Sequence, residues 1–276
     1  MMRSWMLFGI LVLGTAPAVA EENQATGDEI VRAVRAGAAS DIASALLRGE
    51  RTQCFGCIGT VETLLYHEDG YVRQLAGIWL RKRPLGFGPV MVRTRETMQD
   101  TGEEPRTRAL AAQALGNFRD WHAGEALSDV ARSDDDAVVR AAAVRAIAVL
   151  NVPRFSPAVS SALGDADAGV RAAGLDAALS LLGFSDHEAV LGLVADPDAS
   201  VRWRATMAVG ELGIEEGAAA LEGVVLGDSD PRARQNAAYA LGVLGASDSR
   251  ATLEAVAEDS DRWVRSAARI ALAMLR

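Results

Sequence analysis

The sequence predicts an all-α protein, a right-handed solenoid in which about seven helix–turn–helix repeats stack behind a divergent N-terminal cap. Three observations support this prediction. One motif recurs at spacings of 35, 32, 31, 31, 32 and 31 residues, its apolar residues follow a helical period, and only 5% of the residues are aromatic although 50% are hydrophobic. Because one helix pair cannot bury both of its apolar faces, such units must stack on one another.

The first segment, residues 1–20, has the pattern of a secretory signal peptide. Arg3 precedes an apolar run from Trp5 to Leu13, and Ala18–Ala20 offers a cleavage site of small residues. The run is too short to cross a bilayer, which needs about 20 apolar residues. We therefore expect an exported protein, periplasmic or secreted, that does not remain inserted in a membrane after cleavage.

Residues 21–60 are expected to form an N-terminal capping segment, with Asp28–Gly49 as a divergent pair of short helices. The segment contains the only two cysteines, Cys54 and Cys57. In an exported protein a structural disulfide that pins the cap to the first full repeat is the favoured interpretation. A redox-active pair and a metal site stay open as alternatives, although no βαβ context is visible and a zinc site needs four ligands.

The solenoid itself is predicted over residues 61–276, where an arginine follows an acid by four residues in every repeat. A small residue three positions after the arginine and an apolar residue seven positions after it lie on one face of a helix. The acid stands where it can cap the first turn and complement the helix dipole. The seven pairs are Asp69 and Arg73, Glu104 and Arg108, Asp136 and Arg140, Asp167 and Arg171, Asp198 and Arg202, Asp230 and Arg234, and Asp261 and Arg265.

Shorter apolar segments between the motifs predict the second helix of each repeat, for example over residues 125–131, 189–194 and 219–225. The prolines and glycines of residues 84–89 predict a loop that breaks the array and explains the longest spacing. We expect the helices to end at glycines, with Gly116, Gly210 and Gly242 followed in two repeats by Gly213 and Gly245. Trp263, two residues before its arginine, is expected to be buried where two repeats meet.

The motif D-x-x-V-R-x-x-A-x-x-A-L-G resembles HEAT repeats of the short type that occurs in phycobilisome-lyase-like proteins, over Val61–Arg276. The resemblance implies that the motif helix lines a concave face and that the repeated acid and arginine form a structural ladder between repeats. HEAT-type deoxyhypusine hydroxylases bind a di-iron centre with His-Glu pairs just inside the motif helix. The two pairs here, His67-Glu68 and His187-Glu188, lie at helix edges, so no metal site is expected.

The net charge of the chain and the motifs that its sequence lacks argue against several classes of function. The formal net charge of -9 argues against a surface for nucleic-acid phosphates. The sequence contains no Gly-rich phosphate loop and no nucleophile elbow. We therefore expect no catalytic residues, no cofactor and no nucleic-acid partner. The sequence does not indicate an oligomeric state.

Binding is expected on the concave face, at the positions one and five residues after each motif arginine. The packing residues barely change between repeats, whereas these positions vary, which is typical of a recognition surface. Aromatic residues with polar neighbours often anchor interfaces, although Trp203 could instead pack on the adjacent helix. The candidate partner-binding residues are Trp203, Met207, Gln235, Tyr239, Arg145 and Gln113.

The predicted function is a non-catalytic scaffold that holds a partner protein or peptide in this groove. Two alternatives remain: an accessory lyase-like protein that acts on a chromophore, which the resemblance alone suggests, and a redox protein that acts on a thiol partner through Cys54 and Cys57.

Overall fold

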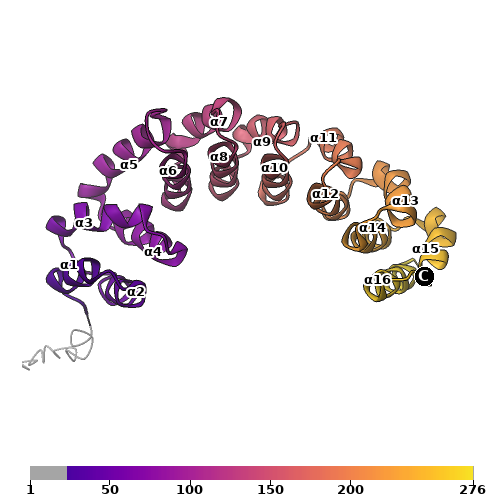
Figure 1. The fold of residues 1–276 in the computed structure, drawn as a ribbon, viewed down its shortest axis with the longest axis horizontal. Coiled ribbons are helices and arrows are strands. Elements are labelled where there is room, and N and C mark those ends of the chain that lie inside the picture. The colour runs from indigo at the N-terminus through magenta and orange to yellow at the C-terminus, as the bar shows by residue number, and fades with distance from the viewer. Residues whose placement is uncertain (1–23, 276) are drawn as a thin grey trace, which may run out of the picture.

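The computed structural model describes residues 24–275, so the predicted signal peptide at residues 1–20 lies outside the described residues. Within this range the chain folds into sixteen α-helices and seven short 3-10 helices, without a β-strand. The helices form two layers that curve together into an arc, with an inner and an outer helix in each repeat (Figure 1). The predicted all-α repeat solenoid is confirmed.

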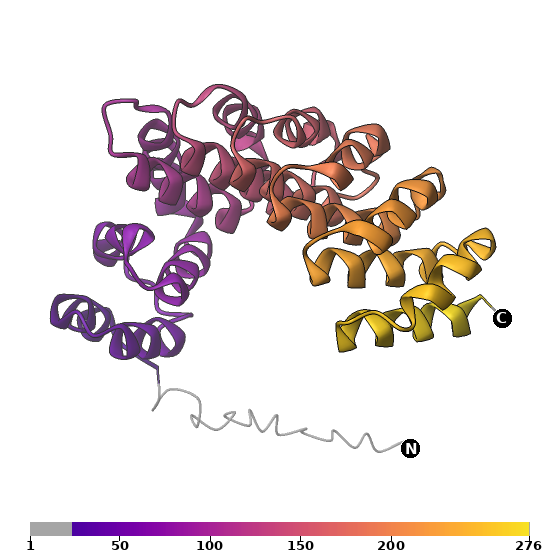
Figure 2. The ribbon, with the colours of Figure 1, turned by 45° about the vertical axis from the view of Figure 1, so that its right-hand side comes forward.

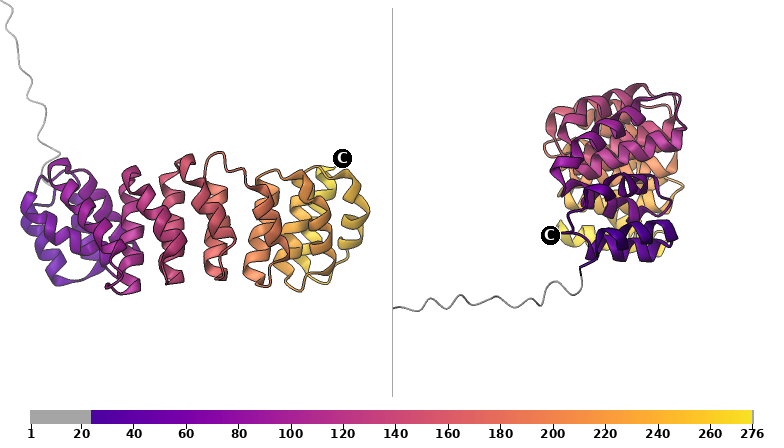
Figure 3. Two further views of the ribbon diagram at one scale, coloured as in Figure 1. Left: turned by 90° about the horizontal axis from the view of Figure 1, so that it is seen from above. Right: turned by 90° about the vertical axis from the view of Figure 1, so that its left-hand side faces the viewer.

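In the described part of the chain, the inner layer carries one helix of the cap, α2 (Ala39–Arg48), and the seven motif helices. The motif helices are α4 (Gly70–Arg81), α6 (Pro105–Phe118), α8 (Ala137–Leu150), α10 (Ala168–Ser180), α12 (Ala199–Glu211), α14 (Pro231–Val243) and α16 (Arg262–Met274). Seen from above, the helices stand side by side in one row (Figure 3), and an oblique view follows the arc from the N-terminal to the C-terminal helices (Figure 2).

Apart from α5 (Pro84–Gln99), the outer layer is built from helices of at most ten residues. These shorter helices are α1 (Gly27–Ala36), α3 (Ile58–Thr63), α7 (Gly124–Ser133), α9 (Ser156–Leu163), α11 (His187–Gly192), α13 (Ala218–Gly227) and α15 (Arg250–Val256). The 3-10 helices η1 (Phe55–Cys57), η2 (Leu64–Tyr66), η3 (Trp121–Ala123), η4 (Pro153–Phe155), η5 (Leu193–Ala195), η6 (Glu215–Gly217) and η7 (Ser247–Ser249) begin or extend the outer helices.

The core follows the predicted stripe of the inner helices. In α8 the positions before, three after and seven after the arginine are Val139, Ala143 and Ile147, and all three are fully buried. Because the stripe consists of small and aliphatic residues, neighbouring helices pack closely along the whole arc.

Three glycines expected to end helices lie inside them instead. A Cβ on Gly242 would come within 2.6 Å of the Cα atom of Ala271 on the next inner helix, and Gly116 faces Ala146 in the same way at 3.0 Å. These glycines therefore allow backbones to approach each other. Gly213 and Gly245 do end their helices, with φ angles of 68° and 66° in the left-handed region.

The predicted loop at residues 84–89 is wrong, because this segment is the first part of α5. Pro84 occupies the first helical position, where a missing N–H costs nothing. Gly86 packs against the side chain of Ile58, where a Cβ would come within 1.9 Å of Cδ1. Phe87 stacks edge-on against Phe118 with ring centroids 4.8 Å apart. The long spacing thus reflects a longer outer helix.

The cap is a helix pair, as expected, with α2 in the inner layer and α1 in the outer layer (Figure 1). Thr26 and Glu29 form a capping box at the start of α1. The next outer helix, α3, already begins at Ile58. The predicted boundary between residues 60 and 61 therefore falls within a helix.

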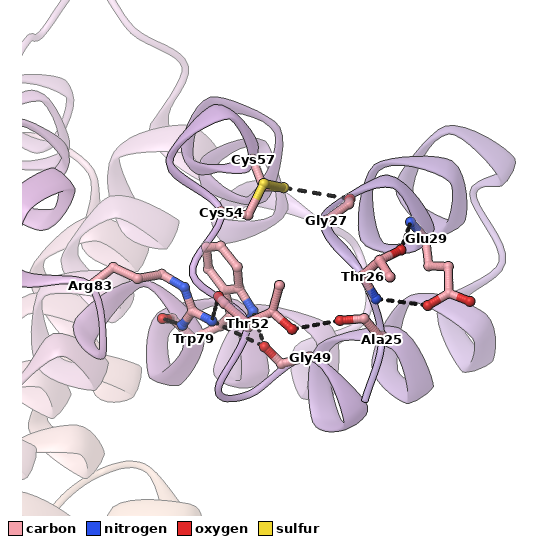
Figure 4. Close-up of a disulfide and its surroundings, with 10 residues drawn as sticks. All are labelled: Ala25, Thr26, Gly27, Glu29, Gly49, Thr52, Cys54, Cys57, Trp79 and Arg83. Carbon is pink, nitrogen blue, oxygen red and sulfur yellow. Dashed lines mark hydrogen bonds between the residues drawn. A yellow bond between two sulfur atoms is a disulfide. The ribbon is translucent and has the colours of Figure 1, made fainter. Parts of the chain in front are cut away.

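A buried arginine fastens the cap to the first full repeat (Figure 4). The Nη2 atom of Arg83 donates to the carbonyl oxygens of Gly49, Glu50 and Thr52 at 3.0, 3.1 and 2.6 Å, and the indole Nε1 of Trp79 donates to Gly49 at 2.9 Å. Burial lowers the pKa of Arg83 to about 10, so the guanidinium stays charged at neutral pH.

Candidate functional site

The motif acids act as helix caps. Six of the seven accept hydrogen bonds from backbone N–H groups of the first turn of their inner helix; for example, Asp167 accepts from Gly169 at 2.8 Å and from Val170 at 3.1 Å. The exception is Glu104, whose side chain makes no capping bond. These six acids therefore lie at the N-cap position that the sequence predicts.

The arginines do form a ladder between repeats, but not with the motif acids. Each central arginine donates from Nε and Nη2 to both carboxylate oxygens of a different aspartate in the next repeat, at 2.6–3.1 Å. The observed pairs are Arg108 with Asp134, Arg140 with Asp165, Arg171 with Asp196, Arg202 with Asp228, and Arg234 with Asp259.

Each ladder aspartate has a second task at the start of its own inner helix. The Oδ1 atom of Asp165 accepts from the backbone N–H of Asp167, and its backbone carbonyl accepts from Nη1 of Arg171. One aspartate therefore binds three groups: the arginine of the previous repeat, the turn that caps its own inner helix, and the arginine of its own repeat. The sequence signal was present, because these aspartates precede the motif arginines by six residues in five repeats.

The first and last repeats depart from the ladder. His67 occupies the place of the ladder aspartate before α4, where its Nδ1 atom accepts from the N–H of Asp69 at 3.0 Å. Arg73 donates to the side chain of Gln113 at 3.0 Å instead of to a carboxylate. Gln113, a predicted partner-binding residue, is therefore partly engaged within the protein. Within residues 24–275, Arg265 in the last inner helix donates only to the carbonyls of Asp259 and Ser260.

The electrostatics of the ladder are those of paired charges. Hydrogen bonds from Arg140, Arg202 and Arg234 hold the pKa values of Asp165, Asp228 and Asp259 below their ordinary value, and the same bonds raise the pKa values of the arginines. Both partners therefore stay ionised at neutral pH, which suits a structural role rather than proton transfer.

Two grooves open on the concave side of the inner helices. The C-terminal groove, of about 500 Å³, lies between α12, α14 and α16. Its lining is mainly apolar and comprises Met207, Gly210, Glu211, Gln235, Asn236, Tyr239, Ala240, Val243, Trp263, Ser266, Ala267 and Ile270. Three of the predicted binding residues, Met207, Gln235 and Tyr239, meet here.

The fourth member of the predicted aromatic patch, Trp203, does not line this groove. It is half-buried against the core, with the guanidinium carbon of Arg204 4.1 Å from its ring centroid. Its place is taken by Trp263, which is 56% exposed and not buried between repeats as expected. The reason is its position: two residues before the arginine of α16, a side chain points away from the buried stripe and into the groove.

The N-terminal groove, of about 560 Å³, lies between α6 and α8 and contains the other two predicted residues, Gln113 and Arg145. Arg106, on α6, lines the same groove, and neither it nor Arg145 forms a salt bridge within residues 24–275. One carboxylate, that of Asp136, also lies at this groove, where it caps α8.

The two cysteines form a disulfide in the turn before α3, on the outer side of the cap (Figure 4). Both lie in this one turn, so the bond does not link the cap covalently to the first repeat. It packs on Gly27 at the start of α1, where a Cβ would come within 2.6 Å of the Cys54 sulfur. Cys57 is almost completely buried.

Among residues 24–275, no group of three or more His, Cys, Asp or Glu side chains is arranged to hold a metal ion. In the same range no helix has the length and apolar character needed to cross a membrane.

Comparison with known families identifies the repeats. A family model described as HEAT repeats matches residues 59–148, 95–181 and 187–273, which together cover most of the chain. The chain belongs to the HEAT-repeat family. The predicted resemblance is thereby confirmed. Comparison with curated protein sequences gives no match.

Solved structures with HEAT-type solenoids are similar in fold. YibA of E. coli has a TM-score of 0.60 at 15% identity, with 89% of this chain and 92% of that chain covered. Kap95p, solved with RanGDP, has a TM-score of 0.59 at 12% identity, and 90% of this chain covers 39% of its length. The complex of CpcE and CpcF of phycocyanin lyase from Nostoc sp. PCC7120 has a TM-score of 0.44 at 21% identity, covering 79% and 86%.

Proposed function

We propose that this HEAT-repeat protein is an exported, non-catalytic scaffold that holds a partner protein or peptide along its concave face. The observation that supports the proposal is the contrast between two classes of position on the inner helices. Packing, capping and ladder positions keep the same residue types from repeat to repeat, whereas the groove positions change. A surface that differs in each repeat while its frame stays constant is suited to recognition.

The exposed apolar side chains of the C-terminal groove add to this support. Tyr239, Val243, Trp263 and Ile270 are each about half exposed on neighbouring inner helices. A contiguous apolar patch with polar residues at its margin is typical of an interaction site. Kap95p, whose solenoid is similar, was solved with a protein bound, which illustrates this use of the fold.

Export is proposed from the leader pattern of residues 1–20, and the Cys54–Cys57 disulfide supports an oxidising compartment. A structural role for the bond is proposed because it packs on Gly27 at the start of α1; Cys57 is buried and Cys54 is partly buried. Mass spectrometry of the protein from the culture medium or the periplasm tests this part of the proposal. A mature chain that begins at Glu21 would support export, and an intact Met1 in the cytoplasm would contradict it.

Site-specific photo-crosslinking tests the binding face. A benzophenone amino acid replaces Tyr239 or Arg145 on the concave side, and Leu226 on outer helix α13 serves as the control. We expect both concave probes to cross-link one and the same protein in the native extract, and the outer probe not to do so. Equal capture by the outer probe would show that the concave face is not the binding surface.

A further inference from the structure

The two grooves share a mainly apolar lining between inner helices but differ in the charged and aromatic side chains that line them. Two residues before the motif arginine, the last inner helix of each groove carries Val138 or Trp263, and five residues after it Arg145 or Ile270. The N-terminal groove is lined by two arginines, Arg106 and Arg145, and one carboxylate, Asp136. The C-terminal groove is lined by Tyr239 and Trp263, by aliphatic side chains and by the carboxylate of Glu211, and among the described residues no lysine or arginine belongs to its lining, although the guanidinium of Arg262 lies 4.5 Å from the ring of Trp263.

The positive charge of the N-terminal groove is notable in a chain with a formal net charge of -9. Five arginines of the inner helices are held by the ladder, whereas both groove arginines are exposed and form no salt bridge within residues 24–275. Unpaired guanidinium groups in a concave site favour a ligand with carboxylates, which they can bind in a bidentate manner.

Distance limits the kind of ligand that can reach both grooves. The helix pair α6 and α8 is separated from α14 and α16 by four steps along the inner layer, at roughly 8–10 Å for each step. The resulting path of roughly 30–40 Å corresponds to about 9–12 residues of extended chain at about 3.3 Å each. An extended peptide segment can follow such a path along the curved inner layer.

From these features we propose that the concave face binds an extended, unfolded segment of a partner protein with a polar end and an apolar end. The segment places Asp or Glu side chains between Arg106 and Arg145, and an aromatic or large aliphatic side chain beside Tyr239 and Trp263. Roughly ten residues separate the two anchors. The inference rests on the proposed function and adds the chemistry of the partner.

Selection from a library of random 16-residue peptides on phage, with the full chain as bait, tests this inference. We expect the selected peptides to combine carboxylates with an aromatic or aliphatic residue about 9–12 positions away. The double variant Arg106→Glu/Arg145→Glu is expected to bind the selected peptides about tenfold or more weakly. It should instead select peptides with Lys or Arg at the polar end and keep the apolar end.

Matched variants separate the two anchors. Tyr239→Ser/Trp263→Ser should lose the apolar preference and keep the acidic one, and Arg132→Glu, on outer helix α7, should bind as the wild type does. Circular dichroism confirms that each variant is folded. Selected peptides without acidic residues, or equal affinity of the wild type and the Arg106→Glu/Arg145→Glu variant, would overturn the inference.

Two further results distinguish this inference from the proposed function. If the concave photo-crosslinks identify a partner but the library yields no enriched peptides, the partner is a folded domain; the extended-segment inference fails and the scaffold function stands. If a single-stranded oligonucleotide binds through Arg106 and Arg145 while peptides do not, the ligand class is wrong. If the crosslinks are absent as well, both proposals fail.

Discussion

Breaking one rung of the ladder measures how much the ladder stabilises the stack. The substitution is Arg202→Met, which keeps much of the aliphatic stem and removes the guanidinium. Arg202 donates to Asp228 at 2.6 and 2.9 Å, and the side chains of the two residues are only 16% and 5% exposed. The substitution also removes the Nη1 bonds to the carbonyls of Asp196 and Pro197.

The expected cost follows from the charge that is left behind. Removing one partner of a buried ion pair costs about 3–5 kcal/mol, because the other charge stays desolvated without compensation. Since Arg202 lies partly at the surface, we expect about 3 kcal/mol. The control is Arg132→Met, whose pair with Asp129 is exposed at 43% and 67% and is expected to contribute less than about 0.5 kcal/mol.

Urea titration followed by far-UV circular dichroism measures the free energy of unfolding, fitted with a nearest-neighbour model because repeats can unfold in parts. The double variant Arg202→Met/Asp228→Asn should cost less than the sum of the two single variants, since the orphaned charge is gone. Hydrogen exchange should show the loss of protection at the junction of α12 with the next repeat. A cost for Arg202→Met no larger than that for Arg132→Met would refute the assigned role of the ladder.

Three further predictions concern pH, close packing and capping. Arg202 lowers the pKa of Asp228 in the folded state. The stabilisation by this pair is therefore complete above the unfolded-state pKa of about 4 and is lost as the pH falls through the lower folded-state pKa. The urea midpoint should drop on acidification, and it should drop by less in the variant Asp228→Asn. Gly242→Ala should separate α14 from α16 and lower the unfolding free energy of the last repeat by about 2 kcal/mol or more in a urea titration. The control Gly223→Ala, in α13, places its Cβ where no atom lies within 4 Å and should raise the unfolding free energy by about 0.5–1 kcal/mol. Equal effects of the two variants would contradict the close approach of α14 and α16. Glu104→Asp should supply the cap missing from α6 and raise the unfolding free energy by about 0.5–1 kcal/mol, and an unchanged value would show that the backbone there cannot accept a cap.

The sequence was sufficient for the repeat but not for the ladder, for a physical reason. The period, the buried stripe and the caps all depend on residues within one helix, whose spacing determines what they face. A ladder rung joins Arg140 to Asp165 across two repeats, and such a pairing depends on how helices pack. The resemblance to HEAT repeats implies a ladder but does not identify which aspartate each arginine meets.

Two other differences arise where local propensity and packing compete. Pro84 and the glycines after it suggest a loop, yet Pro84 is acceptable at the first helical position and Gly86 is needed against Ile58. Trp263, two residues before Arg265, is predicted to be buried where two repeats meet, yet it is 56% exposed and lines the C-terminal groove. A large apolar residue is buried only on average, and here the packing of the inner helices leaves its position open to the concave side.

The residues that hold the repeats together differ from the residues that line the grooves, and this difference leads to a last prediction. The stripe and the ladder hold the repeats together, so the groove positions should tolerate exchange between repeats. Trp263→Val/Ile270→Arg gives α16 the residues that α8 carries at the same two positions, Val138 and Arg145. Because Trp263 and Ile270 are already about half exposed, the cost should be about 1 kcal/mol, well below that of a broken rung. The variant should keep its helical circular dichroism spectrum and lose the preference for apolar peptide ends. Loss of hydrogen-exchange protection throughout α15 and α16 would show instead that the groove residues stabilise the stack, and that recognition and folding share the same side chains.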